Sequence, residues 1–292
     1  LILKFDDSLR FVKMQGAGND YVYIDCMNQM VPNPAALARR ISRRHFSIGS
    51  DGLILIRPSS RADCFMDIYN ADGSRGKTCG NGLRCTAKYM YETYLRFGAQ
   101  REKTLTIETL SGCHQIKVLA WSLSKALVSV NMGQAKPLDW MMPAVIPGMK
   151  APISTSCISM GNPHCVLFMD AMEDLENMDL AGRYVEHYCG FPERVNVEFC
   201  AVNPMTKDTD RELDIKVRVF ERGSGETLAC GSGACAVAAV FLNKKQTKSG
   251  MLQRVYMHMP GGTLTVEKVK ENLWLTGDAV TVCHGEIALT SA

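Results

Sequence analysis

The 292-residue sequence has no Cys-x-x-Cys pair, although it contains twelve cysteines. This spacing is typical of zinc sites and of thioredoxin-like redox sites, so its absence argues against both. The six histidines also lack the spacing of metal ligands, and we expect no metal. Most of the cysteines lie in apolar, strand-like runs, which predicts core thiols in a reducing compartment.

Long hydrophobic runs and runs of one charge are also missing. The longest apolar run, Ala234 to Leu242, is far shorter than the roughly 20 residues of a membrane-spanning helix. The net charge is only +3, and we interpret Arg39 to Arg44 as the solvated face of a helix that Asn33 and Pro34 begin. We therefore expect no membrane or nucleic-acid partner and no signal peptide. The expected location is the cytoplasm, or the plastid stroma if the source is a plant.

Two cysteines stand out because each opens a turn of small residues that leads into helix-compatible sequence. Cys79 precedes Gly-Asn-Gly, and Cys230 precedes Gly-Ser-Gly. At a helix start, free backbone N–H groups and the helix dipole stabilise a thiolate, so we expect both thiols to have a pKa below the free value of about 8.5. A single turn of this kind would be an ordinary connection between secondary-structure elements, but two matched thiols suggest one acid and one base.

The order of predicted elements around these cysteines occurs twice. Each half has a Gly-Asn turn before a hydrophobic strand, then a helical segment, further strands, the cysteine helix and hairpin-like strands. We predict an α/β (α+β) fold of two pseudo-symmetric lobes, each a mixed, mostly antiparallel sheet curved around a central helix. The lobes are expected at residues 11–132 and 153–286, with a proline-containing linker at 133–152. Leu1 to Leu9 is expected to lie outside the fold.

The segments that follow the two cysteines differ in polarity. The segment after Cys230 is small and apolar on every side, which predicts a helix buried within a curved sheet. After Cys79, Arg84, Lys88 and Glu92 recur at helical spacing and predict a helix with one accessible polar face. If the lobes face each other through their repeated turns, Cys79 and Cys230 would meet across one cleft.

Several segments resemble the diaminopimelate epimerase family, in the family's order, from Phe11 to about Glu286. They are Lys13–Tyr21, Asp51–Gly52, Asn70–Ser74, Cys79–Cys85, Gly161–His164, Arg194–Asn196, Glu221–Thr227 and Ala229–Ala234. The resemblance implies a two-lobed fold in which each sheet wraps a central helix. It also implies an epimerase that needs no cofactor and interconverts L,L- and meso-diaminopimelate, in lysine and cell-wall precursor biosynthesis.

The resemblance assigns roles to the residues at matching positions. Cys79 and Cys230 are implied to be the base and the acid at the α-carbon, with His164 and Glu221 setting their protonation and contacting the substrate ammonium. Backbone N–H groups at the two helix starts suit the substrate carboxylate, since glycine permits close approach and helix N-termini favour anions. These groups belong to Gly80, Asn81, Gly231 and Ser232. The residues implied to bind the far end of the substrate are Asn19, Asn70, Asn162, Asn196 and Arg222.

Two positions depart from the family, and other functions stay open. Gln15 stands where many relatives have His, and Gly52 lacks the glutamine side chain that some members use at the substrate. The alternative is a cofactor-independent racemase of histidine, hydroxyproline or a broad range of amino acids, which would lose part of the far-end set. A redox or metal-binding thiol protein is a further alternative. The partners we expect are a small amino-acid substrate and a second copy in a homodimer.

Overall fold

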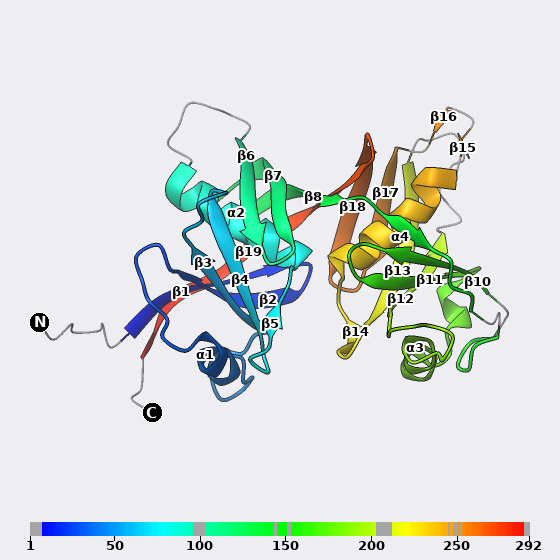
Figure 1. Ribbon diagram of the computed structural model, residues 1–292, viewed down its shortest axis with the longest axis horizontal. Coiled ribbons are helices and arrows are strands. Elements are labelled where there is room, and N and C mark those ends of the chain that lie inside the picture. The colour runs from blue at the N-terminus through cyan, green and yellow to red at the C-terminus, as the bar shows by residue number, and fades with distance from the viewer. Residues whose placement is uncertain are drawn as a thin grey trace, which may run out of the picture. The chain divides into compact units, whose positions relative to one another are not determined.

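The computed structural model describes residues 8–95, 103–142, 145–150, 153–202, 212–244, 246–247, 250–251 and 253–288. These residues fall into two compact units (Figure 1). The first unit runs to Val130 and resumes at Asp278, and the second extends from Asn131 to Gly277. Among the described helices, none is both long and apolar enough to cross a membrane.

The first unit is a mixed sheet that closes on itself. Neighbouring strands follow the order β19, β1, β2, β3, β4, β6, β7, β8, and β8 pairs again with β19. The pairs β2–β3 and β4–β6 are parallel, whereas β1–β2, β3–β4, β6–β7 and β7–β8 are antiparallel. The bounds are β1 Ser8–Gly16, β2 Asn19–Asp25, α1 Pro34–Ile41, β3 Gly52–Arg57, β4 Cys64–Asn70, β5 Arg75–Gly76, α2 Gly80–Met90, a π-helical turn Tyr91–Leu95, β6 Lys103–Thr109, β7 Gly112–Trp121, β8 Lys125–Gly133 and β19 Asn272–Ala288.

The second unit repeats this arrangement. Its strands follow the order β9, β10, β11, β12, β13, β17, β18, β19, with parallel pairs at β11–β12 and β13–β17, the positions that match the first unit. The bounds are β9 Lys136–Leu138, β10 Ser154–Ser159, β11 Pro163–Met169, a 3-10 turn Met172–Asp174, α3 Met178–Glu186, β12 Asn196–Val202, β13 Glu212–Glu221, β14 Gly225–Thr227, α4 Gly231–Lys244, β15 Gln246–Thr247, β16 Gly250–Met251, β17 Arg254–Met259 and β18 Gly262–Val269. The predicted fold class and repeat are confirmed.

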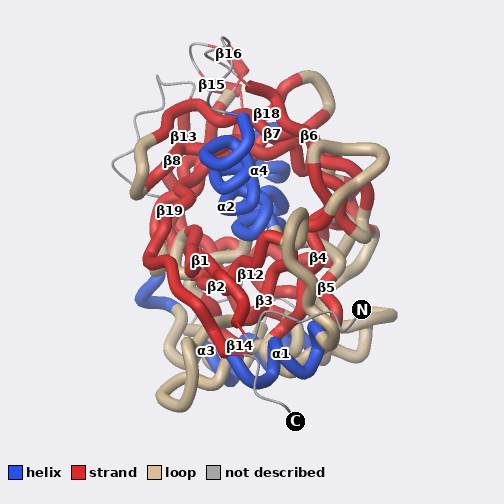
Figure 2. Tube along the Cα trace, turned by 90° about the vertical axis from the view of Figure 1, so that its left-hand side faces the viewer, coloured by secondary structure: helices blue, strands red, loops and turns tan. Residues whose placement is uncertain are grey.

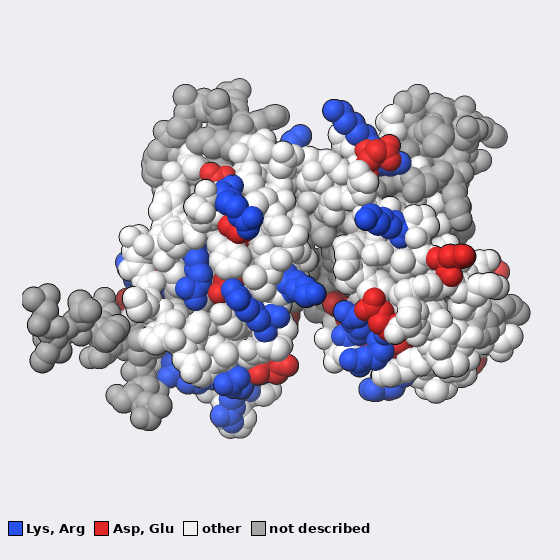
Figure 3. Space-filling model, viewed as in Figure 1, with Lys and Arg blue, Asp and Glu red and all other residues white. Residues whose placement is uncertain are grey.

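The outer helices α1 and α3 begin in the same way. Asn33 caps α1 by accepting a hydrogen bond from the Ala36 N–H, and Asn177 caps α3 by accepting one from Leu180. Each helix turns one apolar side onto a core of buried strand residues. The arginines of the Arg39–Arg44 stretch are mostly exposed, as predicted, and charges of both signs are mixed on the face drawn in Figure 3.

The two cysteine helices, α2 and α4, are both buried within strands (Figure 2). Residues Ala234 to Ala239 of α4 are at most 2% exposed, which confirms the burial predicted from their apolar sequence. The predicted accessible face of α2 is wrong, because Arg84 and Lys88 are both fully buried.

Hydrogen bonds explain how α2 buries two cations. Arg84 Nε donates to the Asp278 carbonyl oxygen at 3.1 Å. Lys88 Nζ donates to Glu92 Oε2 at 2.8 Å, to Leu123 O at 2.9 Å and to Thr281 Oγ1 at 2.8 Å, so all three of its N–H bonds are used. Part of the cover comes from β19, at the far end of the chain, and local spacing could not reveal it.

The boundaries predicted for the lobes need three corrections. Ser8 and Leu9 belong to β1, where they pair with Ala288 and Ile287, so the fold begins before Phe11. Residues 278–286, expected in the second lobe, lie in the first unit for the same reason. Within the expected linker, β9 pairs with β10 and Ile146 is a core residue of the second unit.

Replacing Lys88 by Ala should lower the free energy of unfolding by about 3 kcal/mol, because Glu92 would lose a buried cationic partner. Lys117 on β7 is exposed, and Lys117→Ala should change stability by less than about 0.5 kcal/mol. Urea unfolding of the two variants tests this. Equal midpoints for both would show that the Lys88 contacts do not stabilise the fold.

Candidate active site

Cys79 is the N-cap of α2, as the sequence predicts. Its backbone is extended, at φ −149° and ψ 116°, and its Sγ accepts a hydrogen bond from the Gly82 N–H at 3.3 Å. The thiol also donates to Asn19 Oδ1 at 3.4 Å. Cys79 is partly exposed, whereas Gly80 and Asn81 behind it are buried. The first unit thus presents a thiol at the edge of a buried helix start.

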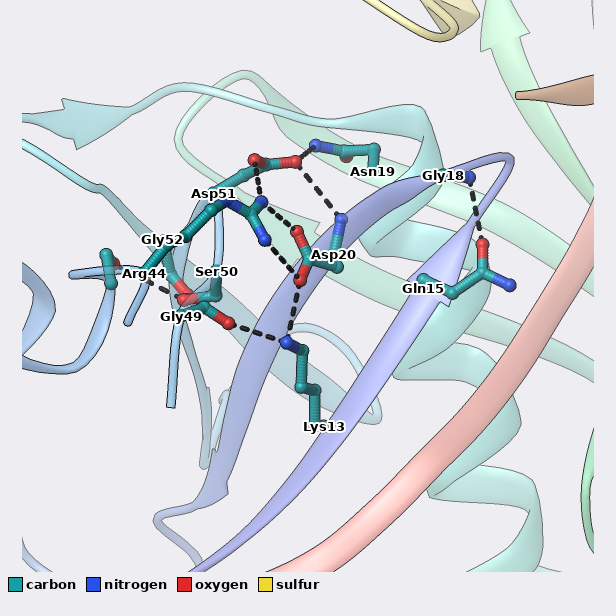
Figure 4. A network of polar contacts seen from close by, with 11 residues as sticks. Lys13, Gln15, Gly18, Asn19, Asp20, Arg44, Gly49, Ser50, Asp51 and Gly52 are labelled. Atoms are coloured by element: carbon teal, nitrogen blue, oxygen red, sulfur yellow. Dashed lines mark hydrogen bonds and ion pairs between the residues drawn. The ribbon is translucent and has the colours of Figure 1, made fainter. Parts of the chain in front are cut away.

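The side-chain amide of Asn19 has a fixed direction. Its Nδ2 donates to Asp51 Oδ2 at 2.7 Å, which turns its Oδ1 toward Cys79 Sγ and toward Asn81 Nδ2, the latter at 3.4 Å. Asp51 in turn forms an ion pair with Arg44 at 3.0 Å. Figure 4 shows the contacts of Asn19 and Arg44 with Asp51, which link the turn at Asn19 to the loop before β3.

The same network keeps Asp20 ionised. Partial burial would raise the pKa of its carboxyl, but Arg44 at 2.7 Å and Lys13 at 2.9 Å outweigh burial and lower it. The Asp20 N–H also donates to Asp51 Oδ2 at 3.1 Å. The ion pairs of Asp20 and Asp51 therefore lie at the Nδ2 end of the Asn19 amide, whereas its Oδ1 faces the cysteine.

Asn81 is also oriented by a buried partner. Arg84 Nη2 donates to Asn81 Oδ1 at 2.8 Å, so the Asn81 Nδ2 points to Asn19. Arg84 thereby links the first turn of α2 to the carbonyl of Asp278.

Asn70, Gly52 and Gln15 lie at or near the ends of β4, β3 and β1. Asn70 Nδ2 donates to Ser74 Oγ at 2.9 Å, so its side chain is held in the β4–β5 turn. Any side chain at position 52 would clash with the Tyr69 carbonyl oxygen, so this backbone requires Gly52. Gln15 Oε1 accepts from the Gly18 N–H at 2.9 Å and stabilises the turn before Asn19.

Cys230 occupies the equivalent place in the second unit, directly before α4. Its Sγ accepts from the Gly233 N–H at 3.4 Å and lies 3.4 Å from Ser232 Oγ. Burial, followed by the negative charges of Glu221 and Glu198, raises the pKa of the Cys230 thiol well above its usual value. The opposing effects of Ser232 and the Gly233 N–H are smaller. The expected lowering of this pKa is therefore wrong for Cys230, because burial outweighs the helix start.

His164 is the second residue of β11 and lies beside this helix start. Its Nδ1 is 2.6 Å from Glu198 Oε1, and its Nε2 is 3.2 Å from Asn162 Oδ1. The His164 and Glu198 side chains are both completely buried. A Cβ atom on Gly233 would lie 2.5 Å from Glu198 Oε1, so Gly233 lets the carboxylate approach the helix.

The other predicted residues of the second unit lie on the neighbouring strand and turn. Asn196 Nδ2 donates to the Pro163 carbonyl at 3.1 Å, and Asn196 Oδ1 accepts from the Arg222 N–H at 3.0 Å. The Arg222 guanidinium is exposed and pairs with Glu193 at 3.0 Å. Glu221 accepts from Thr227 Oγ1 at 2.6 Å.

Three residues with clear contacts to this machinery had no predicted site role. Asp51 orients Asn19, Arg84 orients Asn81, and Glu198 binds His164. The role of Glu198 could have been suspected from the sequence, because it is the single acidic residue in the mostly apolar stretch from Val195 to Cys200. Arg84 had been interpreted as solvent-exposed, and nothing local in the sequence indicates otherwise.

Comparisons with known proteins agree on one family. The family model for diaminopimelate epimerase matches residues 11–138 and 156–286. A diaminopimelate epimerase from Desulfovibrio desulfuricans is 40% identical over 96% of this chain and 98% of its own length. One from Methanococcus maripaludis is 38% identical over 96% of this chain and 99% of its own length.

Solved structures of similar fold are far more distant in sequence. A phenazine biosynthesis protein of the PhzF family from Bacillus anthracis has a TM-score of 0.72 at 14% identity, covering 97% of this chain and 99% of its own. A hydroxyproline epimerase from Agrobacterium vitis has a TM-score of 0.68 at 13% identity, covering 98% and 93%. At these identities the likeness concerns the fold alone.

Gly233→Ala should lower catalytic activity by roughly tenfold or more, because its new methyl group would displace the Glu198 carboxylate. On helix propensity alone, Ala would stabilise the protein by about 1 kcal/mol. Turnover assays together with thermal unfolding test this. Full activity and a raised Tm would mean that Glu198 tolerates the methyl group.

Because its pKa is raised, Cys230 should remain protonated, and poorly reactive toward iodoacetamide, at pH values where a free thiol of pKa about 8.5 is half ionised. Its alkylation rate should rise with pH later than that of the exposed Cys189. Peptide mass spectrometry over a pH series measures both sites. A Cys230 midpoint at or below that of Cys189 would contradict the raised pKa.

Proposed function

The chain belongs to the diaminopimelate epimerase family, and from this premise we propose that it interconverts L,L- and meso-diaminopimelate. The observation that carries the proposal is the repeated helix start, where Cys79 and Cys230 each accept a hydrogen bond from the third residue of the motif that follows. The enzyme would be an isomerase that works with its own side chains and needs no cofactor.

Inversion of an α-carbon without a cofactor needs a base for one face and an acid for the other. We assign these roles to Cys79 and Cys230, which exchange them when the reaction runs backwards. In the resting enzyme, Cys230 is the protonated thiol, which its burial and two acidic neighbours support. Cys79, more exposed and with its Sγ accepting from the Gly82 N–H, is the group that becomes the thiolate base.

The substrate carboxylate gains negative charge as the α-proton leaves. Backbone N–H groups in the first turn of a helix lack intrahelical partners and suit such a charge. In this chain they belong to Gly80 and Asn81 at one helix start, and to Gly231 and Ser232 at the other. Each helix start would thus carry its own thiol and its own pair of N–H donors.

The far end of diaminopimelate carries an ammonium and a second carboxylate. We propose that Arg222 binds that carboxylate, since its guanidinium fork matches the anion's geometry. Its present partner, Glu193, is exposed, and an exposed ion pair of this kind contributes only about 0–1 kcal/mol, so Arg222 can exchange partners at low cost. The amides that would complete this set belong to Asn19, Asn70, Asn162 and Asn196.

His164 and Glu221 would support proton transfer in the second unit. Glu221 is close enough to Cys230 to affect its titration, which fits a role at the reacting ammonium. His164 reaches Asn162 with one ring nitrogen and Glu198 with the other. A cytoplasmic location, with all twelve thiols free, and a homodimer remain part of the proposal.

The competing function is racemisation of a simpler amino acid. The hydroxyproline epimerase of similar fold makes this a concrete alternative. Exchange of α-hydrogen for deuterium in D2O discriminates the two, with L,L-diaminopimelate, meso-diaminopimelate, L-histidine and trans-4-hydroxy-L-proline as separate substrates. Exchange confined to the diaminopimelates supports the proposal, and comparable exchange with histidine or hydroxyproline would refute it.

The cysteine assignment has its own test. Cys79→Ala and Cys230→Ala should each reduce epimerisation at least about 100-fold, because each removes one of two proton-transfer groups. Cys113→Ala and Cys189→Ala are matched controls at exposed thiols, one in each unit, and should keep normal turnover. Near-normal turnover of either site variant would refute the two-thiol mechanism.

A further inference from the structure

Among the described residues, the acidic side chain of Glu198 is completely buried beside the Cys230 helix start, and the proposed mechanism leaves it without a role. It lies on β12 two positions after Asn196, so both side chains project from the same face of the strand. His164 pairs with Asn196 in the parallel register of β11 and β12. Three polar side chains of the second unit therefore share one face next to α4.

The ring of His164 is held from both sides. Its Nε2 lies 3.2 Å from Asn162 Oδ1, and its Nδ1 lies 2.6 Å from Glu198 Oε1. A ring that makes a hydrogen bond at each nitrogen has a fixed orientation. Glu198 therefore supplies one of the two contacts that orient His164.

His164 contacts only one of the two carboxylate oxygens of Glu198. Among the described residues, Glu198 Oε2 is buried and has no hydrogen-bond partner. The carboxylate also packs against the Cα of Gly233, whose N–H donates to Cys230 Sγ. Its charge therefore acts on the thiol at short range, as the raised pKa of Cys230 reflects.

We propose that Glu198 is a positioning residue of the Cys230 half of the site, which holds the His164 ring against Asn162 and thereby fixes both side chains beside the start of α4. Its carboxylate, which lies against Gly233, also keeps Cys230 as the proton donor of the resting enzyme. The groups that face Cys230 are Glu221 from β13, Glu198 from β12, and Ser232 and the Gly233 N–H from α4. This inference rests on the proposed function for its kinetic part only.

Glu198→Gln tests the proposal, because glutamine keeps the shape and the acceptor but removes the charge. We expect kcat for L,L-diaminopimelate to fall roughly tenfold or more while KM changes by less than about threefold. The pH midpoint of Cys230 alkylation should fall by about one unit, since a neighbouring negative charge is lost. Glu212→Gln, at an exposed carboxylate on β13, is the matched control and should change none of these.

The two readouts separate failure of this inference from failure of the proposed function. Alkylation needs no substrate, so it tests Glu198 even if the wild-type protein does not epimerise diaminopimelate. A folded Glu198→Gln protein with wild-type kcat and an unchanged Cys230 midpoint would overturn the inference. Gly233→Ala is a second route to the same group if the glutamine variant does not fold, and it should shift the Cys230 midpoint in the same direction.

Discussion

The architecture depends on burying a helix start without leaving its backbone N–H groups unpaired. In each unit a sulfur atom meets this need, by accepting the N–H of Gly82 in one unit and of Gly233 in the other. The remaining N–H groups of the first turn are then available to an anion. One structural requirement of the fold thus yields both a reactive thiol and an anion-binding surface, which is why the active-site chemistry and the repeat coincide.

The side chains that surround the two cysteines differ in charge. Next to Cys79 lie the amides of Asn19 and Asn81 and the buried cation Arg84, which donates to Asn81. Next to Cys230 the side chains of Glu198 and Glu221 bring negative charge to a more deeply buried thiol. The repeated helix starts therefore place their two thiols in different electrostatic surroundings.

The sequence predicted the parts of this structure that depend on local pattern. The α4 helix could be recognised as buried because its apolar residues face every direction, and the N-cap of α1 could be recognised from Asn33 and Pro34. Arg84 and Lys88 were misassigned to solvent because their cover comes from β19, almost 200 positions away. The pKa of Cys230 was predicted wrongly because its burial and its proximity to the Glu198 carboxylate depend on tertiary structure. Local sequence is enough to predict where a helix starts, but it does not show which distant residues pack over that helix.

Strand β19 also has a consequence for how the chain is made. It pairs with β1 from Ser8 opposite Ala288 onward, so the first sheet closes only once residues 272–288 have been synthesised. Until then, β1 has one edge open and the polar side of α2 lacks part of its cover. Contacts of such sequence separation slow folding and expose strand edges meanwhile. Because Ser8 pairs with Ala288, a linker could join these two positions in a circularly permuted variant, with new termini cut in an exposed turn.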